Sequence, residues 1–278
     1  EARDAYGHVL GSGPNIFSGA GATVLFSDLT GSIYDAVTGT PTSDDFVNGV
    51  YNGNVVITRT QVNDQITVSA GGKSGVSTQF DVQPDELSYF TVTGPGGVPI
   101  ASPQTAGAGN AFTIEITARD QYGNTLDAGA NNYGASGETV TLSISTGSIT
   151  VVATGSNQTG AFVNGQWSGN VWVSTAQQNA KIRATDSPGG LGNGVEYGES
   201  NTFNVNADVA VDFVIVTAPA SGATLTAGQG YTIRIEAHDA NGNIDPTFIG
   251  TATLDDADVV PNAGIRVQET GTPSTPAF

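Results

Sequence analysis

The sequence contains no cysteine and no methionine, and it has few basic residues. Without cysteine it cannot form disulfides, thiolate zinc sites, iron–sulfur clusters or a cysteine nucleophile. Eight Lys and Arg stand against 26 Asp and Glu, so the formal net charge is −18. Phosphate contacts need Lys and Arg, and an anionic membrane surface repels an acidic chain. We therefore expect no nucleic-acid partner.

Long apolar runs are also missing. A membrane-spanning helix needs about 18 or more consecutive apolar residues, and the sequence has no such run, so we expect no membrane insertion within this segment. No secretory leader opens the sequence, and residue 1 falls within a strand-like run, so we expect the sequence to be part of a longer protein. An acidic surface rich in Ser, Thr and Asn, with no Cys or Met, is typical of secreted prokaryotic proteins. We expect an extracellular or cell-surface location.

An internal repeat organises the chain. Residues 1–7 (EARDAYG) match residues 117–123 (TARDQYG) at an offset of 116, and the same offset carries FVNG at 46–49 onto 162–165. After Asp186 the middle copy gains about seven residues, and a third copy contains EAHDANGN. Such self-similarity indicates an array of repeats. The predicted domains are a partial repeat lacking its first strand, a complete repeat, and a partial repeat lacking its last strands: 1–85, 86–207 and 208–278.

Apolar and polar residues alternate with period two along much of the sequence, as in 111–118 and 139–144. This spacing predicts half-buried strands, and no helical stripe is longer than one turn. The fold class is therefore all-β, an elongated array of tandem Ig-like β-sandwich domains with about seven strands each. In the complete repeat we predict strands at 87–93, 110–119, 138–145, 148–153, 166–174, 180–186 and 200–206.

The order of motifs resembles the bacterial Ig-like (Big family) domains of invasin- and intimin-type adhesins. A strand is followed by an Asp-x-x-Gly-Asn turn, another strand, and then Asn-Gly-x-Trp-x-Gly-x-Val. The residues that carry the resemblance are Asp120, Gly123, Asn124, Asn164, Gly165, Trp167, Gly169 and Val171. The resemblance implies tandem Ig-like repeats of a large surface protein, and it specifies the fold more closely than any activity, since this fold serves many roles.

The Asp-x-x-Gly-Asn run occurs in all three copies and has two interpretations. The simpler one is a tight turn, in which Asp accepts backbone N–H bonds and Gly adopts a positive φ. The Asp and Gly pairs are Asp4 with Gly7, Asp120 with Gly123, and Asp239 with Gly242. The first copy has His8 at the Asn position, which fits a turn better than a strict ligand.

The alternative interpretation is a calcium site at each domain junction. In a seven-strand sandwich this turn lies at the end that faces the preceding domain, close to the linker before the first strand. Calcium takes several carboxylate and carbonyl oxygens. The candidate ligands are Asp85, Glu86, Asp120 and Asn124 at one junction and Asp208, Asp239 and Asn243 at the next. We expect no other cofactor.

Three aromatic positions on equivalent strands also need an interpretation. Trp167 and Tyr51 are equivalent, and their recurrence favours anchors in the core over stacking on sugars. Trp172 lies on the opposite face of its strand, so we expect it to be exposed and choose it as the candidate ligand contact. The acidic cluster Asp255, Asp256 and Asp258 has no counterpart in the other copies, and we interpret it as solvated surface.

Catalytic residues are not recognisable. Only two histidines occur, both next to the repeated turn, and the sequence has no Gly-x-Ser-x-Gly elbow. We expect a non-enzymatic, structural segment of an extracellular surface protein: an adhesin stalk, a surface-layer subunit or a filament subunit. Its partners would be neighbouring copies of the same protein. The alternatives are a module that binds host glycans or a receptor, and a non-catalytic accessory region of a large secreted hydrolase.

Overall fold

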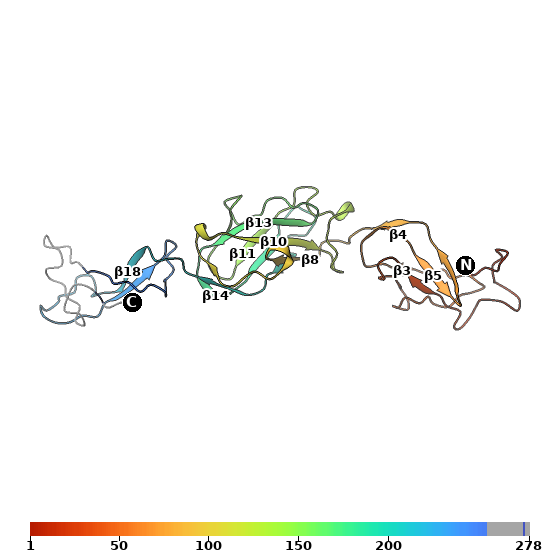
Figure 1. Cartoon of the computed structure of the whole chain (residues 1–278), viewed down its shortest axis with the longest axis horizontal. Coiled ribbons are helices and arrows are strands. Elements are labelled where there is room, and N and C mark those ends of the chain that lie inside the picture. The colour runs from red at the N-terminus through yellow and green to blue at the C-terminus, as the bar shows by residue number, and fades with distance from the viewer. Residues whose placement is uncertain (255–274, 276–278) are drawn as a thin grey trace. The chain divides into compact units, whose positions relative to one another are not determined.

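The computed structural model describes residues 1–254 and 275 (Figure 1). The acidic cluster Asp255, Asp256 and Asp258 lies outside the described residues. The chain divides into two compact units. The first comprises Glu1–Tyr89, Ala118–Glu138 and Phe162–Gln166, and the second comprises Phe90–Thr117, Thr139–Ala161 and Trp167–Phe278. The predicted division into three repeats stays a prediction.

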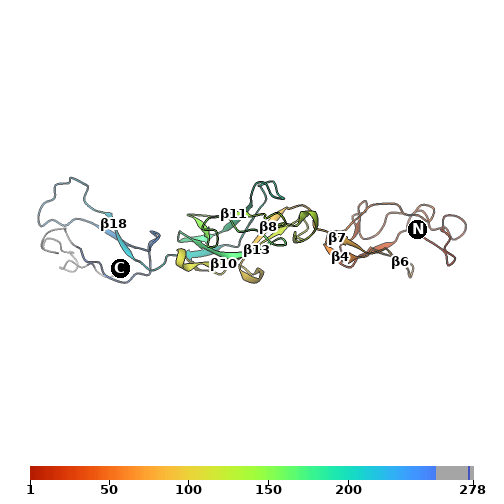
Figure 2. The ribbon, with the colours of Figure 1, turned by 90° about the horizontal axis from the view of Figure 1, so that it is seen from above.

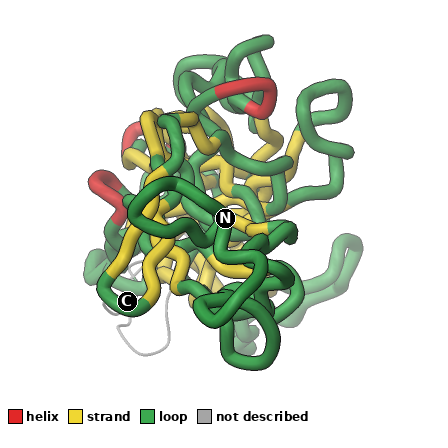
Figure 3. Tube along the Cα trace, turned by 90° about the vertical axis from the view of Figure 1, so that its right-hand side faces the viewer, coloured by secondary structure: helices red, strands yellow, loops and turns green. Residues whose placement is uncertain are grey.

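The described residues form an all-β fold, as the alternation of apolar and polar residues predicts. Their only helical segments are three short 3₁₀ turns, at Pro95–Gly97, Ala108–Asn110 and Gly129–Asn131. Figure 3 shows strands and loops making up almost all of the trace. Strands are short because Gly, Asn and Asp interrupt the β-branched and aromatic runs every few residues.

The second unit contains nearly all of an Ig-like β-sandwich. One sheet has the order β12 (Ile149–Val151), β13 (Gln166–Val173), β10 (Phe112–Arg119) and β8 (Tyr89–Thr93). A second sheet has the order β11 (Val140–Ile144), β15 (Ile182–Asp186) and β16 (Tyr197–Glu199). A third sheet has the order β14 (Gln177–Ala180), β17 (Phe203–Asn206) and β9 (Gln104–Thr105). The first, second, fourth and fifth strands thus share a sheet, as in constant-type immunoglobulin domains. Figure 2 labels three of these strands, β8, β10 and β13.

The predicted strand positions agree with the middle repeat, but one strand is interrupted and two were missed. The sixth predicted strand, 180–186, is interrupted at Lys181 between β14 and β15, and the seventh, 200–206, is shortened to β17, while β16 lies before it and was not predicted. β9 was not predicted because its two residues have no alternating pattern; it pairs in parallel with β17. The stretch before β11 also contains a core residue, since Tyr133 is fully buried and its ring packs edge-on against Phe162 at 4.9 Å.

The first unit contains seven strands that repeat those of the middle repeat. They are β1 (Leu25–Ser27), β2 (Tyr34–Asp35), β3 (Val55–Val56), β4 (Gln61–Asp64), β5 (Thr67–Ala70), β6 (Lys73–Val76) and β7 (Phe80–Val82). They form the sheets β1-β5-β6, β2-β3 and β4-β7, which correspond to β11-β15-β16, β12-β13 and β14-β17.

The offset of 116 holds for individual strand pairs. Leu25 pairs with Ser69, and adding 116 to both gives Thr141 and Thr185, which also pair. Register is fixed by which residues face the core, because a shift of one residue would turn every side chain to the other face. The sequence repeat is therefore a repeat of structure at the level of single residues.

The Asn-Gly motif forms a tight hairpin turn in both copies. Asn48 and Gly49 have φ values of 53° and 77°, and Asn164 and Gly165 have 48° and 74°. Two consecutive positive φ angles define a type I′ turn, which Asn-Gly adopts at the lowest cost. The N–H of Val163 donates to the carbonyl of Gln166 across the turn, at 2.8 Å.

β10 shows how alternation builds the core. Ile114, Ile116 and Ala118 are fully buried, whereas the residues between them are half-buried. Each buried isoleucine stabilises the fold by about 1.5–3 kcal/mol through removal of apolar surface from water. The third copy is different: β18 (Asp212–Thr217) and β19 (Arg234–His238) pair with each other, but Ile233, the equivalent of Ile114, is 39% exposed.

This difference predicts unequal costs for one substitution at two equivalent positions. Ile114→Ala should lower the free energy of unfolding of the middle repeat by about 2–5 kcal/mol, because it leaves a cavity in a closed core. Both tryptophans belong to this repeat, so urea unfolding followed by Trp fluorescence measures it. Ile233→Ala is the matched control and should leave that transition unchanged. Equal shifts from the two variants would contradict the assignment of Ile114 to the core.

Candidate functional site

The repeated Asp-x-x-Gly-Asn run forms the same turn in each copy. Gly7, Gly123 and Gly242 have φ values of 85°, 87° and 80°, which only glycine adopts without strain. In each turn the Gly N–H donates to the Asp carbonyl three residues earlier, at 3.0–3.1 Å. The turn interpretation therefore describes the backbone, and the side chains of the turn make further contacts.

At the middle copy, the carboxylate of Asp120 accepts four hydrogen bonds. Oδ1 accepts the N–H groups of Tyr122 at 2.9 Å and Asn124 at 2.8 Å. Oδ2 accepts the linker N–H of Asp85 at 3.1 Å and the side-chain Nδ2 of Asn124 at 2.7 Å. Asp120 is fully buried. One carboxylate thus joins the turn, the linker and the Asn side chain.

Asn124 extends this network to the loop after β3. Its Nδ2 also donates to the carbonyl of Thr58 at 2.8 Å, and its Oδ1 accepts the N–H of Thr60 at 3.2 Å. An Asn amide offers two donor hydrogens and one acceptor oxygen, and here all of them are used. Both ends of these bonds lie within the first unit.

The third copy has the same network within the second unit. Asp239 accepts the N–H groups of Asn241 at 2.8 Å, Asn243 at 2.9 Å and Asp208 at 3.0 Å, and the side-chain Nδ2 of Asn243 at 2.8 Å. Nδ2 of Asn243 also donates to the Ser174 carbonyl at 2.9 Å. We call each set of bonds around one Asp and one Asn, Asp120 with Asn124 and Asp239 with Asn243, a clasp.

The two clasps reach equivalent loops. The second clasp is completed by the N–H of Ala176, which donates to Oδ1 of Asn243 at 2.9 Å. Adding 116 to Thr58 and Thr60 gives Ser174 and Ala176, so the same two backbone groups are used in both copies. We call 58–60 and 174–176 the junction loops. Each clasp therefore joins an Asp-x-x-Gly-Asn turn to a junction loop that precedes it in the sequence, within one unit.

Hydrogen bonding keeps the Asp239 carboxylate ionised. Burial raises the pKa of Asp239, but the hydrogen bonds from the Asn243 side chain and N–H and from the Asp208 N–H outweigh it, so the pKa lies below its ordinary value. The hydrogen bond from the Gln121 side chain, at 2.8 Å, lowers the pKa of Asp85. An ionised carboxylate only accepts hydrogen bonds, which is what the N–H donors around it require.

The predicted calcium ligands are arranged differently from a calcium site. Of the seven candidates, Glu86 is exposed and makes no hydrogen bond to either clasp in the described residues. N–H groups occupy both oxygens of Asp120 and of Asp239. Residues 1–254 and 275 contain no group of three or more His, Cys, Asp or Glu that could hold a metal ion. Calcium takes 6–8 oxygen ligands, so carboxylate oxygens that already accept N–H groups do not fit a calcium ion. Calcium binding stays an untested prediction.

A cavity of about 310 Å³ lies beside the first clasp, within the first unit. Thr58, Asp85, Asp120, Tyr122 and Asn124 contribute to its lining. Asp85 and Asp120 are the only charged residues in the lining, and both already accept hydrogen bonds from protein groups. The cavity therefore belongs to the junction.

The equivalent aromatics Trp167 and Tyr51 cover glycines. A Cβ atom at Gly169 would overlap the Trp167 ring, and one at Gly53 would overlap the Tyr51 ring, which explains the Gly two residues after each aromatic. Both rings are half-buried, in agreement with an anchoring role. Trp172 was expected to be exposed, which is wrong: it is half-buried, on the face opposite Val171 and paired across the sheet with Thr150.

Tyr51 differs from Trp167 in having a buried acidic partner. Its hydroxyl donates to Asp35, which is fully buried. Burial, and then the hydrogen bond and charge of Asp35, raise the pKa of Tyr51 to about 12. The hydrogen bond from Tyr51 lowers the pKa of Asp35. The middle copy has Val151 and Trp167 at these positions, so this polar pair is a local alternative for filling the same core.

Comparison with known proteins gives distant matches only. No protein-family model matches the chain, and no curated protein matches its sequence. Among solved structures it is similar to invasin, a bacterial integrin-binding protein, with 17% identity over 84% of this chain and a TM-score of 0.32. It is also similar to the β-glucuronidase of Parabacteroides merdae, with 12% identity over 64% of this chain and a TM-score of 0.26. The chain spans 42% of the length of the first protein and 20% of the second, and both TM-scores are too low to support a conclusion about function.

The geometry of the second clasp predicts a pKa change. Asn243→Ala removes one hydrogen bond from Oδ2 of Asp239, so the pKa of Asp239 should rise toward its ordinary value of about 3.9. Carboxyl ¹³C NMR titration measures it. Asn241→Ala is the control, because it keeps the backbone N–H that donates to Asp239 and should leave the pKa low.

The same pKa sets the pH dependence of the clasp. Because the folded-state pKa of Asp239 is below the unfolded value, its contribution to stability is fully present above about pH 4 and is lost as the pH falls through the folded-state pKa. Asn243→Ala should therefore flatten the acid limb of the stability profile. A profile and a pKa unchanged by this variant would contradict the clasp.

Proposed function

We propose that the chain is a structural tandem-repeat segment of an extracellular cell-surface protein, in which neighbouring Ig-like repeats are held in fixed relation so that the segment spans distance. One observation carries the proposal: both junctions with a described partner loop have the same clasp, bond for bond. A repeated junction that uses a buried carboxylate and a fully bonded Asn supports a mechanical role, since nearest-neighbour interfaces set the stability of repeat arrays.

The charge distribution supports the same role. A net charge of −18 with few cations favours solubility at high local concentration. The described residues include no helix of the length and apolarity that a membrane crossing requires. We propose an extracellular location, and neighbouring copies of the same protein as partners in a stalk, surface layer or filament.

We propose no catalytic activity. The polar groups that recur between the copies, Asp120 with Asn124 and Asp239 with Asn243, bond to one another and to backbone. Glycan or receptor binding is the second candidate function, and the part of Trp172 that stays accessible on the outer face of β13 favours it. A glycan array decides between the two: reproducible binding that is lost in Trp172→Ala would favour the binding module.

The structural role predicts that the clasps restrict motion between repeats. We expect Asn124→Ala and Asn243→Ala together to let the repeats reorient independently, because each variant removes the side-chain bonds from the Asp-x-x-Gly-Asn turn to a junction loop. Backbone ¹⁵N relaxation and residual dipolar couplings measure this: one alignment tensor should describe the natural chain, and separate tensors the double variant.

The control variant keeps both clasps and removes a side-chain amide elsewhere. Gln178→Ala changes an exposed side chain on β14 that takes part in neither clasp, and it should leave the single tensor intact. Separate tensors for the repeats in the natural chain itself would contradict a fixed junction.

A further inference from the structure

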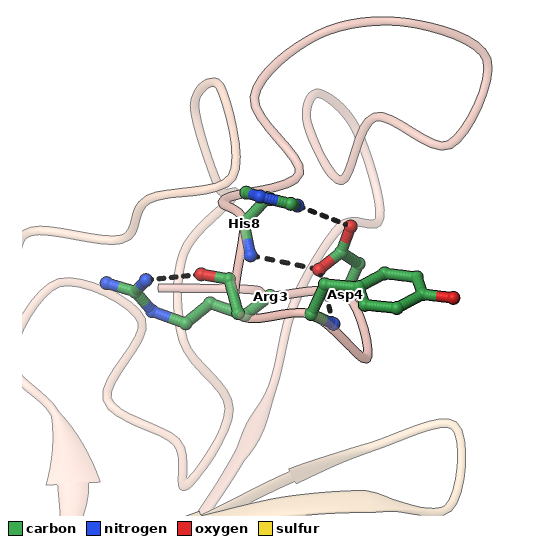
Figure 4. A network of polar contacts seen from close by, with 5 residues as sticks. Arg3, Asp4 and His8 are labelled. Atoms are coloured by element: carbon green, nitrogen blue, oxygen red, sulfur yellow. Dashed lines mark hydrogen bonds and ion pairs between the residues drawn. The ribbon is translucent and has the colours of Figure 1, made fainter.

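The first turn of the chain has half of a clasp. Oδ1 of Asp4 accepts the N–H groups of Tyr6 at 2.8 Å and His8 at 2.9 Å, as the equivalent carboxylates do in the other copies. Nδ1 of His8 lies 3.2 Å from Oδ2 of Asp4, and Nη1 of Arg3 donates to the carbonyl of Gly7 (Figure 4). Among the described residues, no hydrogen bond reaches the turn 4–8 from a junction loop.

The side chains of this turn are more exposed than those of the turn in the middle copy. Tyr6 is 86% exposed, whereas Tyr122, at the equivalent position, is 46% exposed and helps to line the cavity next to Thr58. The His8 side chain is 77% exposed, whereas Asn243 is 9% exposed. In both other copies the equivalent face of the turn lies against a junction loop.

His8 can make only part of the bonds that Asn makes. Neutral imidazole with its proton on Nδ1 donates to Asp4 and keeps Nε2 as an acceptor for a loop N–H, whereas imidazolium has two donors and can bond only the loop carbonyl. Either protonation state makes one of the two loop bonds that Asn124 and Asn243 make. Arg3, Asp4 and the Tyr6 ring, 6.4 Å from the imidazole, are the polar and charged groups around it.

We propose that the Asp4–His8 turn is a docking surface for the junction loop of another Ig-like repeat of this type, and that His8 makes this junction weaker than the two Asn clasps. The partner must offer one backbone carbonyl and, two residues later, one N–H in the geometry of 58–60 and 174–176. A second copy of this chain is a poor partner, because its two described junction loops are already bonded by Asn124 and Asn243. The inference rests on the proposed function.

A fusion that keeps the full chain tests the docking. Residues 86–235 are placed directly before Glu1, because Glu1 is equivalent to Glu236 and the join continues one strand in register. This supplies a complete repeat whose 174–176 loop precedes the Asp4 turn. Segmental labelling then gives the amide hydrogen exchange of Ala176 in the added repeat separately from that in the original one.

We expect the added Ala176 amide to exchange about tenfold more slowly in the fusion than in the fusion with His8→Ala, since a bonded amide exchanges only through local opening. His8→Asn restores the missing bond and should slow exchange further, to the rate of the original Ala176. Protection with Asn but none with His8 would overturn the proposal, and so would no protection with either residue.

Two internal measurements separate the failures. If the original Thr60 and Ala176 amides are themselves unprotected, the fixed junctions of the proposed function fail; if they are protected and only the added loop is free, the docking alone fails. The natural chain is the intermolecular control: its Tyr6 and His8 amide shifts should not depend on concentration up to about 1 mM, the range in which linked modules meet. Concentration-dependent shifts would assign the face to self-association and overturn the proposal.

Discussion

The junctions depend on a buried carboxylate that accepts two N–H bonds from its own turn, one from the linker and one from an Asn side-chain amide. At Asp239 burial opposes ionisation, and an unpaired charge buried there would cost several kcal/mol. The donors offset that cost only when the turn, the linker and the Asn side chain are all in place. The hydrogen bonds that the buried carboxylate needs therefore close the turn and also hold the linker in place.

The Asn side chain bonds the turn to a junction loop. Its amide satisfies the Asp and both backbone groups of a junction loop at once, so neither the carbonyl nor the N–H of that loop is left without a partner. A buried polar group without a partner is destabilising, so the bonded arrangement of the turn and the junction loop is favoured. Core packing keeps the strands together, and each clasp holds one turn against one loop.

Sequence reasoning found the fold because strand periodicity and the offset of 116 depend on side chains that recur. The same reasoning found both residues of each clasp but not the loop they bond, because Thr58 and Ser174 take part only through backbone carbonyls that leave no trace in residue identity. Tyr133 was missed because it lies outside any alternating pattern, and the half-burial of Trp172 because alternation gives the face of a strand but not what covers it. Calcium was inferred from the proximity of acidic residues, which sequence could suggest, whereas the donors that occupy those oxygens could be seen only in three dimensions.

Scalar coupling across the hydrogen bonds of the clasps tests this account most directly. Through-bond NMR correlations should connect Nδ2 of Asn124 to the carbonyl carbon of Thr58, and Nδ2 of Asn243 to that of Ser174, in the unmodified chain. The account predicts both correlations at neutral pH. If neither appears and both side-chain amides exchange as fast as a free asparagine, the repeats are not clasped and the central claim is wrong.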